Sequence, residues 1–143
     1  MRRRIILLRH GHADDGAQDF ERRLSAAGRQ AAAQAGVSLA QAGLLPDLVL
    51  ASAAPRALAT AELAARSAGY GGAIRAEQAL YLASEAQYLG ALRRLTESAR
   101  CVWLVGHNPA LSGLARELCG RAGALAPAEY ASAELELDDW AEL

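Results

Sequence analysis

RIILLRHG, at residues 4–11, carries the first and clearest structural signal in the chain. Its apolar run from Ile5 to Leu8 begins with two β-branched residues and is too short for a helix, which predicts a strand buried on both faces. The run stops at Arg9, and His10 and Gly11 follow immediately. Residues capable of chemistry therefore stand at the carboxyl end of a buried strand.

Short apolar runs that indicate further buried strands recur at Leu48–Ala51 and Cys101–Val105. Weaker strand signals occur around Ile74 and at Ala133–Leu137, where apolar and acidic residues alternate as is typical of a half-exposed edge strand. Helix signals separate these runs. They are the Ser25 cap with a stop at Gly43, Pro55 as a first helical residue with an end near Gly69, the Ser84–Gln87 capping box, and the Asn108 cap before Pro109 with an end at Gly120.

Strands that alternate with helices predict one domain over residues 1–143. The expected fold class is α/β, with three α/β/α layers and a mostly parallel central sheet. Ligands in such folds bind at the carboxyl ends of the strands.

The composition of the 143 residues is that of an ordinary globular protein. Its formal net charge of −1 provides no general attraction to nucleic acid or to an anionic membrane. All 15 basic residues are arginine, which excludes chemistry that needs a lysine amine. Cys101 and Cys119 form no CxxC pair and are expected to be buried, with no redox or metal role. The apolar run after Met1–Arg4 is too short for an export signal, so a cytoplasmic location is expected.

Three strand ends deliver arginine and histidine side chains to one edge of the predicted sheet. Arg9 and His10 follow the first strand, Arg56 lies in the first helical turn after the second, and His107 follows the third. Two guanidinium forks and two imidazoles at one edge fit a dianion, and a phosphoryl group is the obvious candidate. The N-termini of the helices that follow add backbone N–H groups to the same edge.

The expected reaction is attack by His10 on phosphorus. Neighbouring arginines lower the pKa of a histidine, so His10 is expected to be neutral near pH 7 and nucleophilic. Gly11 is expected to let the backbone turn tightly and to leave room for a substrate. A covalent phosphohistidine and its hydrolysis follow, with Arg9, Arg56 and His107 binding the equatorial oxygens. This chemistry requires no cofactor and no metal.

Three sequence patterns resemble those of the histidine phosphatase superfamily, which has the phosphoglycerate-mutase-like fold. They are Arg9-His10-Gly11, Ser52-x-x-x-Arg56-x-x-x-Thr60-Ala61 and Gly106-His107-Asn108-Pro109. The segment Arg22-Arg23-Leu24-Ser25-x-x-Gly28-x-Gln30-Ala31 is similar to the family's R-P-L-T-x-x-G-x-x-Q-A, with Arg23 in place of proline. The small size most resembles the SixA-type phosphohistidine phosphatases, which lack the helical insertions of other branches.

The resemblance implies that His10 is the nucleophile and that a phosphorylated protein or a small phosphorylated molecule is the substrate. Arg22 matches a position where short members carry a further pocket arginine. The residues expected to bind the substrate are Arg9, Gly11, Arg22, Arg56, His107 and Asn108.

The chain departs from larger members at the general acid. Those members carry an L-x-E pattern soon after the middle strand, whereas the matching stretch here is Leu80-Tyr81-Leu82. Glu77 lies slightly upstream, and Glu85 is better explained as a first-turn residue beside the Ser84 cap. The absent acid favours phosphohistidine over phosphate esters, because the P–N bond to imidazole is already labile.

Three alternatives stay open. A pocket of the same composition could hydrolyse small phosphate esters, or could hold a phosphorylated partner without turnover. The run from His10 through His12 to Asp14 and Asp15 also resembles the HxHxDH motif of metallo-β-lactamase-type hydrolases, although Arg9 and Arg56 would repel a cation. Outside that alternative, His12 is expected to be solvated or secondary.

Overall fold

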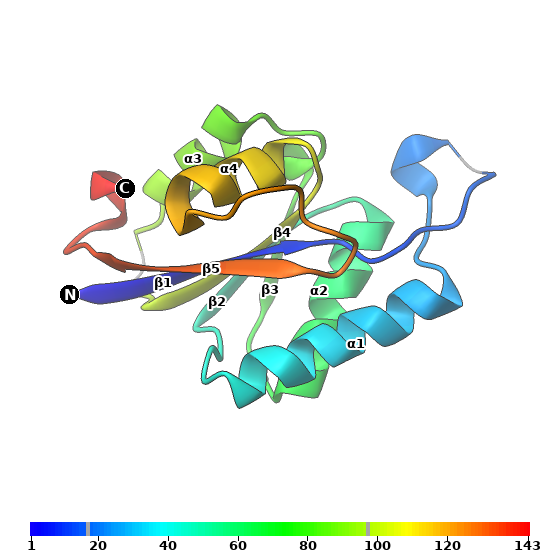
Figure 1. Ribbon diagram of the computed structural model, residues 1–143, viewed down its shortest axis with the longest axis horizontal. Helices are drawn as coiled ribbons and strands as arrows, with labels where there is room; N and C mark the ends of the chain where they lie inside the picture. Colours follow the sequence, from blue (N-terminus) through cyan, green and yellow to red (C-terminus); the bar gives the residue numbers. More distant parts are fainter. Residues whose placement is uncertain (17, 97) are drawn as a thin grey trace.

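A five-stranded sheet forms the centre of the molecule in the computed structural model, which describes residues 1–16, 18–96 and 98–143 (Figure 1). The strands lie in the order β3-β2-β4-β1-β5, and four of them are parallel. Only β5 runs antiparallel, paired with β1 at the edge. The bounds are β1 Arg2–Arg9, β2 Leu48–Ser52, β3 Ile74–Glu77, β4 Cys101–Gly106 and β5 Tyr130–Glu136. The predicted mostly parallel sheet is confirmed.

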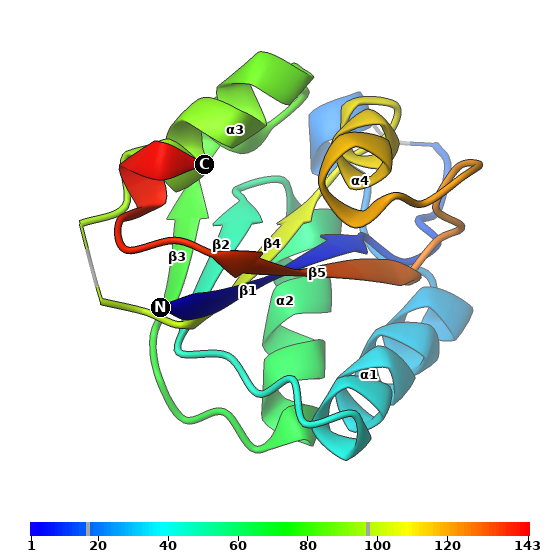
Figure 2. The same cartoon turned by 60° about the vertical axis from the view of Figure 1, so that its left-hand side comes forward.

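Helices cover both faces of the sheet, which gives the predicted three layers (Figure 2). One face carries α1 and α2, and the other carries α3 and α4. Their bounds are α1 Ala26–Gln41, α2 Pro55–Ala68, α3 Glu85–Arg93 and α4 Ala110–Cys119. Short 3₁₀ turns complete the set at Asp19–Glu21, Gln78–Leu80 and Trp140–Glu142.

The sheet divides the core into two clusters, and successive side chains of β1 point alternately into one and the other. Ile5 and Leu7 pack toward α3 and α4, and Ile6 and Leu8 pack toward α1 and α2. All four side chains are completely buried, as predicted for a strand covered on both faces. The α1–α2 contact uses small residues, since the space beside Gly36 is occupied by the Ala64 carbonyl.

The predicted helix boundaries are mostly confirmed. Ser25 accepts a hydrogen bond from the Gly28 N–H at the start of α1, and Ser84 and Gln87 form the capping box of α3. Helix α2 begins at Pro55 and is followed by Gly69 in the left-handed region, at φ 86°.

The cap of α4 was predicted wrongly. The helix begins at Ala110 with Pro109 as its cap residue, so Pro109 is not the first helical residue. The Asn108–Pro109 peptide bond is cis. The Asn108 side chain donates to the Leu125 carbonyl and accepts from the Ser112 hydroxyl, so it is not available to cap the helix N-terminus.

The edge strand starts earlier than predicted, at Tyr130, because its pairing with β1 extends to the register Leu8–Tyr130. Among the described residues, no helix combines the length and the apolar character that a membrane crossing requires.

Candidate active site

The carboxyl ends of β1, β2 and β4 meet at one edge of the sheet. Arg9 pairs with Gly106, and Ala51 pairs with Val105, so the residues that follow these strands are neighbours. The rings of His10 and His107 lie 5.1 Å apart between centroids. They line a pocket of about 280 Å³ together with Arg9, Gly11, His12, Ala13, Asp19, Arg22, Arg56, Leu82, Asn108 and Pro127.

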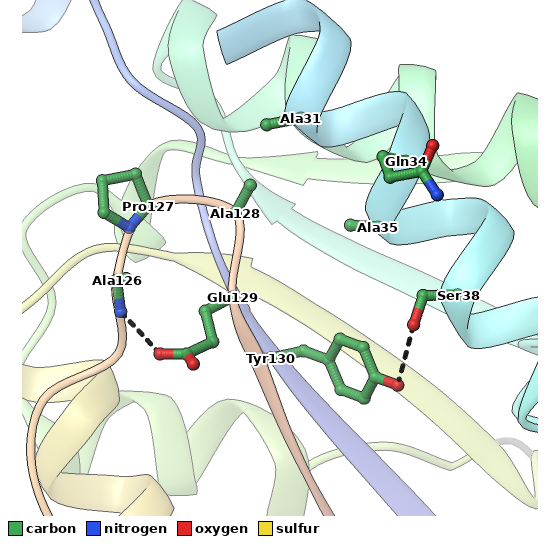
Figure 3. A pocket seen from close by; sticks show the side chains of 9 residues that line it. All are labelled: Ala31, Gln34, Ala35, Ser38, Ala126, Pro127, Ala128, Glu129 and Tyr130. Carbon is green, nitrogen blue, oxygen red and sulfur yellow. Dashed lines mark hydrogen bonds between the residues drawn. The ribbon is translucent and has the colours of Figure 1, made fainter. Parts of the chain in front are cut away.

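A second hollow of about 460 Å³ lies beside this pocket and shares Pro127 with it (Figure 3). Its wall is made of residues of α1 and of the segment 126–130. The carboxylate in it, Glu129, accepts from the Ala126 N–H and from Arg121. No arginine or histidine lies among its described lining residues, so this hollow lacks the donors that an anion requires.

We call Arg9, His10, Arg56 and His107 the inner wall of the pocket. We call Asp19, Arg22 and Leu82 its rim. The Arg56 side chain is 4% exposed, whereas that of Asp19 is 52% exposed. Inner-wall groups therefore act in a desolvated environment, and rim groups meet solvent.

His10 is held through its backbone N–H and one ring nitrogen. Its backbone N–H donates to the Gly106 carbonyl, and its Nδ1 lies 2.7 Å from the Gly11 carbonyl oxygen. A carbonyl oxygen can only accept, so Nδ1 carries the proton. In the neutral ring, Nε2 then keeps a lone pair, which is the electronic state that a nucleophile needs.

Both imidazoles of the inner wall are neutral at physiological pH. Burial, with smaller contributions from Arg56 and Arg9, lowers the pKa of His10 to about 4, against the opposing hydrogen bond to Gly11. Burial also lowers the pKa of His107 to about 3, with smaller contributions from His10, which is charged at such acidic pH, and from Arg56.

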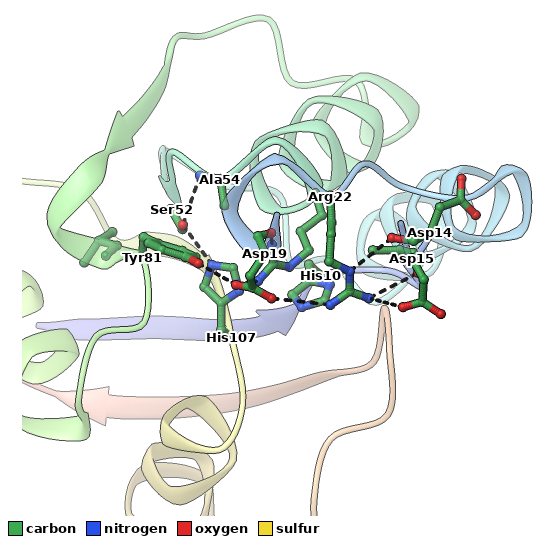
Figure 4. A network of polar contacts seen from close by, with 12 residues as sticks. His10, Asp14, Asp15, Asp19, Arg22, Ser52, Ala54, Tyr81 and His107 are labelled. Atoms are coloured by element: carbon green, nitrogen blue, oxygen red, sulfur yellow. Dashed lines mark hydrogen bonds and ion pairs between the residues drawn. The ribbon is translucent and has the colours of Figure 1, made fainter. Parts of the chain in front are cut away.

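His107 is oriented by two buried hydroxyl groups. Its backbone N–H donates to the Tyr88 hydroxyl over 3.0 Å. Its Nε2 lies 2.8 Å from the Ser52 Oγ, as Figure 4 shows. Ser52 Oγ already accepts from the Ala54 N–H, so its own proton is best satisfied by donation to Nε2. That assignment places a proton on the buried His107 Nδ1, which has no partner among the described residues.

The two inner arginines also present unpaired N–H groups. Arg9 donates from NH1 to the Leu125 carbonyl, and Arg56 donates from NH1 and NH2 to the carbonyl and carboxylate of Asp19. The Nε atoms of both arginines are buried without a partner in the described part of the chain. Together with His107 Nδ1 they are three unsatisfied donors on the inner wall, and a buried donor without an acceptor is costly.

Comparison with known proteins identifies the family. The model of the histidine phosphatase superfamily (branch 1) matches residues 5–81. The chain belongs to the histidine phosphatase superfamily. A significant match among curated sequences was not found.

Solved structures agree with this assignment. The fold is similar to that of a candidate phosphohistidine phosphatase SixA from Agrobacterium tumefaciens, with a TM-score of 0.81, 30% identity, and coverage of 91% of this chain and 90% of that one. It is also similar to the protein histidine phosphatase SixA complexed with tungstate, with a TM-score of 0.78, 25% identity, and coverage of 94% and 88%. A mycobacterial glucosyl-3-phosphoglycerate phosphatase shares the fold at 19% identity, with a TM-score of 0.71 and coverage of 91% and 90%. The protein is therefore a histidine phosphatase.

Gly11 lines the pocket of this histidine phosphatase and also has a packing role that the sequence did not predict. A Cβ there would lie 2.8 Å from the Gly28 carbonyl oxygen of α1, so glycine allows close packing of the strand exit against the helix. The Gly11 N–H donates to the Thr60 hydroxyl, which in turn donates to the Arg56 carbonyl. The segment beside His10 is thereby tied to α2.

The remaining predicted residues lie at the pocket but are engaged by the protein itself. Arg22 donates to the Asp14 and Ala13 carbonyls and lies 3.5 Å from an Asp19 carboxylate oxygen. His12 contacts the Ser25 hydroxyl at the start of α1.

Asn108 binds the loop that precedes β5. It donates to the same Leu125 carbonyl that accepts from Arg9, so it positions that arginine.

The structure brings neither suggested glutamate to the phosphatase pocket. Glu77 and Glu85 are not among the residues that line it. The Glu85 carboxylate lies against Gly113 of α4. Leu82, at the position of the glutamate in the L-x-E pattern, does line the pocket and carries no acid.

Sequence reasoning missed Asp19, Tyr81 and the role of Ser52. Asp19 contacts Arg56, Arg22 and the Tyr81 hydroxyl, and Tyr81 stacks edge-on against His107 (Figure 4). The only sequence signal for Asp19 was an acid three residues before Arg22 in a loop rich in charges.

No group of three His, Cys, Asp or Glu side chains with a metal-binding arrangement occurs in residues 1–16, 18–96 and 98–143. The two histidines of the metallohydrolase-like run use Nδ1 for the Gly11 carbonyl and the Ser25 hydroxyl. Asp15 points toward Arg22 instead.

Proposed function

We propose that this histidine phosphatase removes phosphoryl groups from histidine side chains of other proteins, through a covalent phosphohistidine on His10. The observation that carries the proposal is the convergence of Arg9, Arg56 and His107 on one pocket with His10, whose Nδ1 proton is donated to the Gly11 carbonyl. A phosphoryl group has three equatorial oxygens, and two guanidinium groups and an imidazole can donate hydrogen bonds to them. The similarity to a SixA structure complexed with tungstate, a tetrahedral oxyanion, supports an oxyanion as the ligand.

The reaction requires two displacements at phosphorus. The lone pair on His10 Nε2 forms a bond to phosphorus as the bond to the leaving group breaks, and the leaving group departs with that electron pair. Water then attacks the phosphohistidine, the new P–N bond breaks, and inorganic phosphate is released as the His10 ring is restored. Arg9, Arg56 and His107 bind the oxygens throughout, in a site where burial strengthens each interaction.

The proposed substrate class follows from the leaving group. An alkoxide needs a protonated acid beside it, and Leu82 occupies the place where that acid would act. Imidazole leaves without such help once its ring is protonated. The pocket therefore suits a P–N bond to imidazole better than a P–O bond to an alcohol.

A substrate comparison tests the proposed function. We expect kcat/KM to be higher on a phosphohistidine peptide than on phosphoserine and sugar phosphate esters. Rapid alkaline quenching should trap an acid-labile phosphoryl group on His10, located by mass spectrometry. Faster ester turnover would favour a small-molecule phosphomonoesterase, and phosphate binding without any label or turnover would favour a binding module.

A further inference from the structure

An ionised carboxylate stands at the rim of the pocket without a role in the two displacements. Asp19 Oδ2 accepts from Arg56 NH2 over 3.1 Å and from the Tyr81 hydroxyl, and Oδ1 lies 3.5 Å from Arg22 NH1. The hydrogen bond from Tyr81, and after it the charge of Arg56, lower the pKa of Asp19 below its ordinary value. Asp19 is therefore a carboxylate at neutral pH and has no proton to give.

Asp19 does not occupy the phosphoryl position. It binds the terminal NH1 and NH2 edge of Arg56, whereas Arg56 Nε stays without a partner on the inner wall. His10 lies on the inner wall, and the Asp19 side chain is half exposed at the rim. In-line attack by His10 places the leaving group on the side of phosphorus opposite His10. A histidine of another protein reaches the pocket from the solvent side, where Asp19 lies half exposed.

We propose that Asp19 is a specificity-determining residue that accepts a hydrogen bond from the second ring nitrogen of the departing histidine. This inference rests on the proposed function. The substrate ring then carries phosphorus on one nitrogen and a proton on the other, which is the imidazolium form. When His10 attacks, the P–N electron pair returns to the substrate ring, which leaves as neutral imidazole with its remaining proton facing Asp19.

The same arrangement exists on the other side of phosphorus. His10 Nδ1 donates to the Gly11 carbonyl, so the phosphorylated His10 ring is also an imidazolium with its proton held by an acceptor. The phosphoryl group passes between two rings in matching protonation states, and no proton has to come from the protein. An alkyl ester has no second nitrogen for Asp19 to hold, and its alkoxide meets a negative charge.

The test compares Asp19→Asn with Asp15→Asn on two substrates. Asp15 is the matched control because its side chain is fully exposed in the same loop and does not line the pocket. We expect Asp19→Asn to lower kcat/KM about 10- to 100-fold on a phosphohistidine peptide, the effect of losing one charge-assisted hydrogen bond. On an alkyl phosphate it should change kcat/KM by less than about threefold, and Asp15→Asn should leave both values nearly unchanged.

Two results for Asp19→Asn would overturn the inference. One is a parallel loss of both activities, which would indicate a structural role, and the other is an unchanged preference for phosphohistidine. Tyr81→Phe removes only the hydroxyl that holds Asp19 and should shift the substrate preference in the same direction by a smaller factor. If the unaltered protein forms no label on His10 and hydrolyses no phosphohistidine, the proposed function itself fails. If it does both and Asp19→Asn keeps its preference, only the role of Asp19 fails.

Discussion

The inner wall and the rim of the pocket are built in different ways. Arg9, His10 and His107 lie at the ends of the adjacent parallel strands β1 and β4. Arg56 lies in the first turn of α2, the helix that follows β2. The rim comes from two loops, joined by the contact of Phe20 with Tyr81, whose ring centroids lie 4.9 Å apart. The sheet can therefore fix the position of the residues that perform the chemistry shared by a family. The loops can vary and change the substrate preference without moving those residues.

Loss of the nucleophile gives the largest expected effect. His10→Ala removes the atom that bonds to phosphorus, so turnover should fall by at least about 10³-fold, as for other covalent catalysts. The substitution removes the desolvation cost of a buried imidazole, so the variant should still fold. Steady-state kinetics and thermal unfolding of the same sample check both statements, and substantial turnover by the folded variant would contradict the role of His10.

The next largest difference in activity is expected between an inner-wall arginine and a rim arginine. Arg56→Ala removes a buried stabiliser of the developing charge and should lower kcat by about 10²- to 10³-fold. Arg22→Ala removes a partly exposed rim arginine that already contacts Asp15 and Asp19, and should cost less than about tenfold. Equal losses in the two variants would show that inner wall and rim do not differ in function.

Ser52 is a positioning residue of the inner wall, acting through His107. Ser52→Ala removes the hydroxyl that fixes the His107 tautomer and should lower kcat about tenfold with a smaller change in KM, at a stability cost of about 1–3 kcal/mol. In a His107→Gln background the same change should have little further effect on kcat. Additive losses in this double-mutant cycle would mean that Ser52 acts independently of His107.

A gain of function at the rim would sharpen the comparison. Leu82→Glu restores a carboxylic acid at the position of the L-x-E pattern, where an optimally placed acid contributes about 10²-fold or more. We expect about a tenfold rise in kcat/KM on an alkyl phosphate and little change on a phosphohistidine peptide. Leu82→Gln is the matched control, and a similar rise with glutamine would exclude general-acid catalysis as the cause.

The last expected effect is on stability at mildly acidic pH and not on rate. The pKa values of His10 and His107 are about 4 and about 3 in the folded protein and near 6.5 in the unfolded chain, which binds more protons in between. Stability therefore falls as pH is lowered through this window. Urea unfolding from pH 7 to pH 5 should show a shallower loss for His107→Gln than for the unaltered protein. Equal slopes would contradict these pKa shifts.

The sequence predicted the inner wall because parallel strands bring their carboxyl ends together whatever the loops do. The sequence could not predict that Asp19 lies at the pocket. Its contact with Tyr81 joins residues that are 62 positions apart and depends on the conformation of two loops. The prediction that Asn108 caps α4 was wrong for a similar reason. Asn108 has the residue type of a helix cap, but the loop carbonyl of Leu125 and the Ser112 hydroxyl compete for its side chain.

A crystal structure with bound tungstate tests the central claim most directly. The account predicts one oxyanion with its oxygens at hydrogen-bond distance from donors of Arg9, Arg56 and His107, and with His10 Nε2 facing the tungsten atom. Tungstate bound at the rim arginine Arg22 alone, or in the hollow beside α1, with the three inner donors still unpaired, would contradict it.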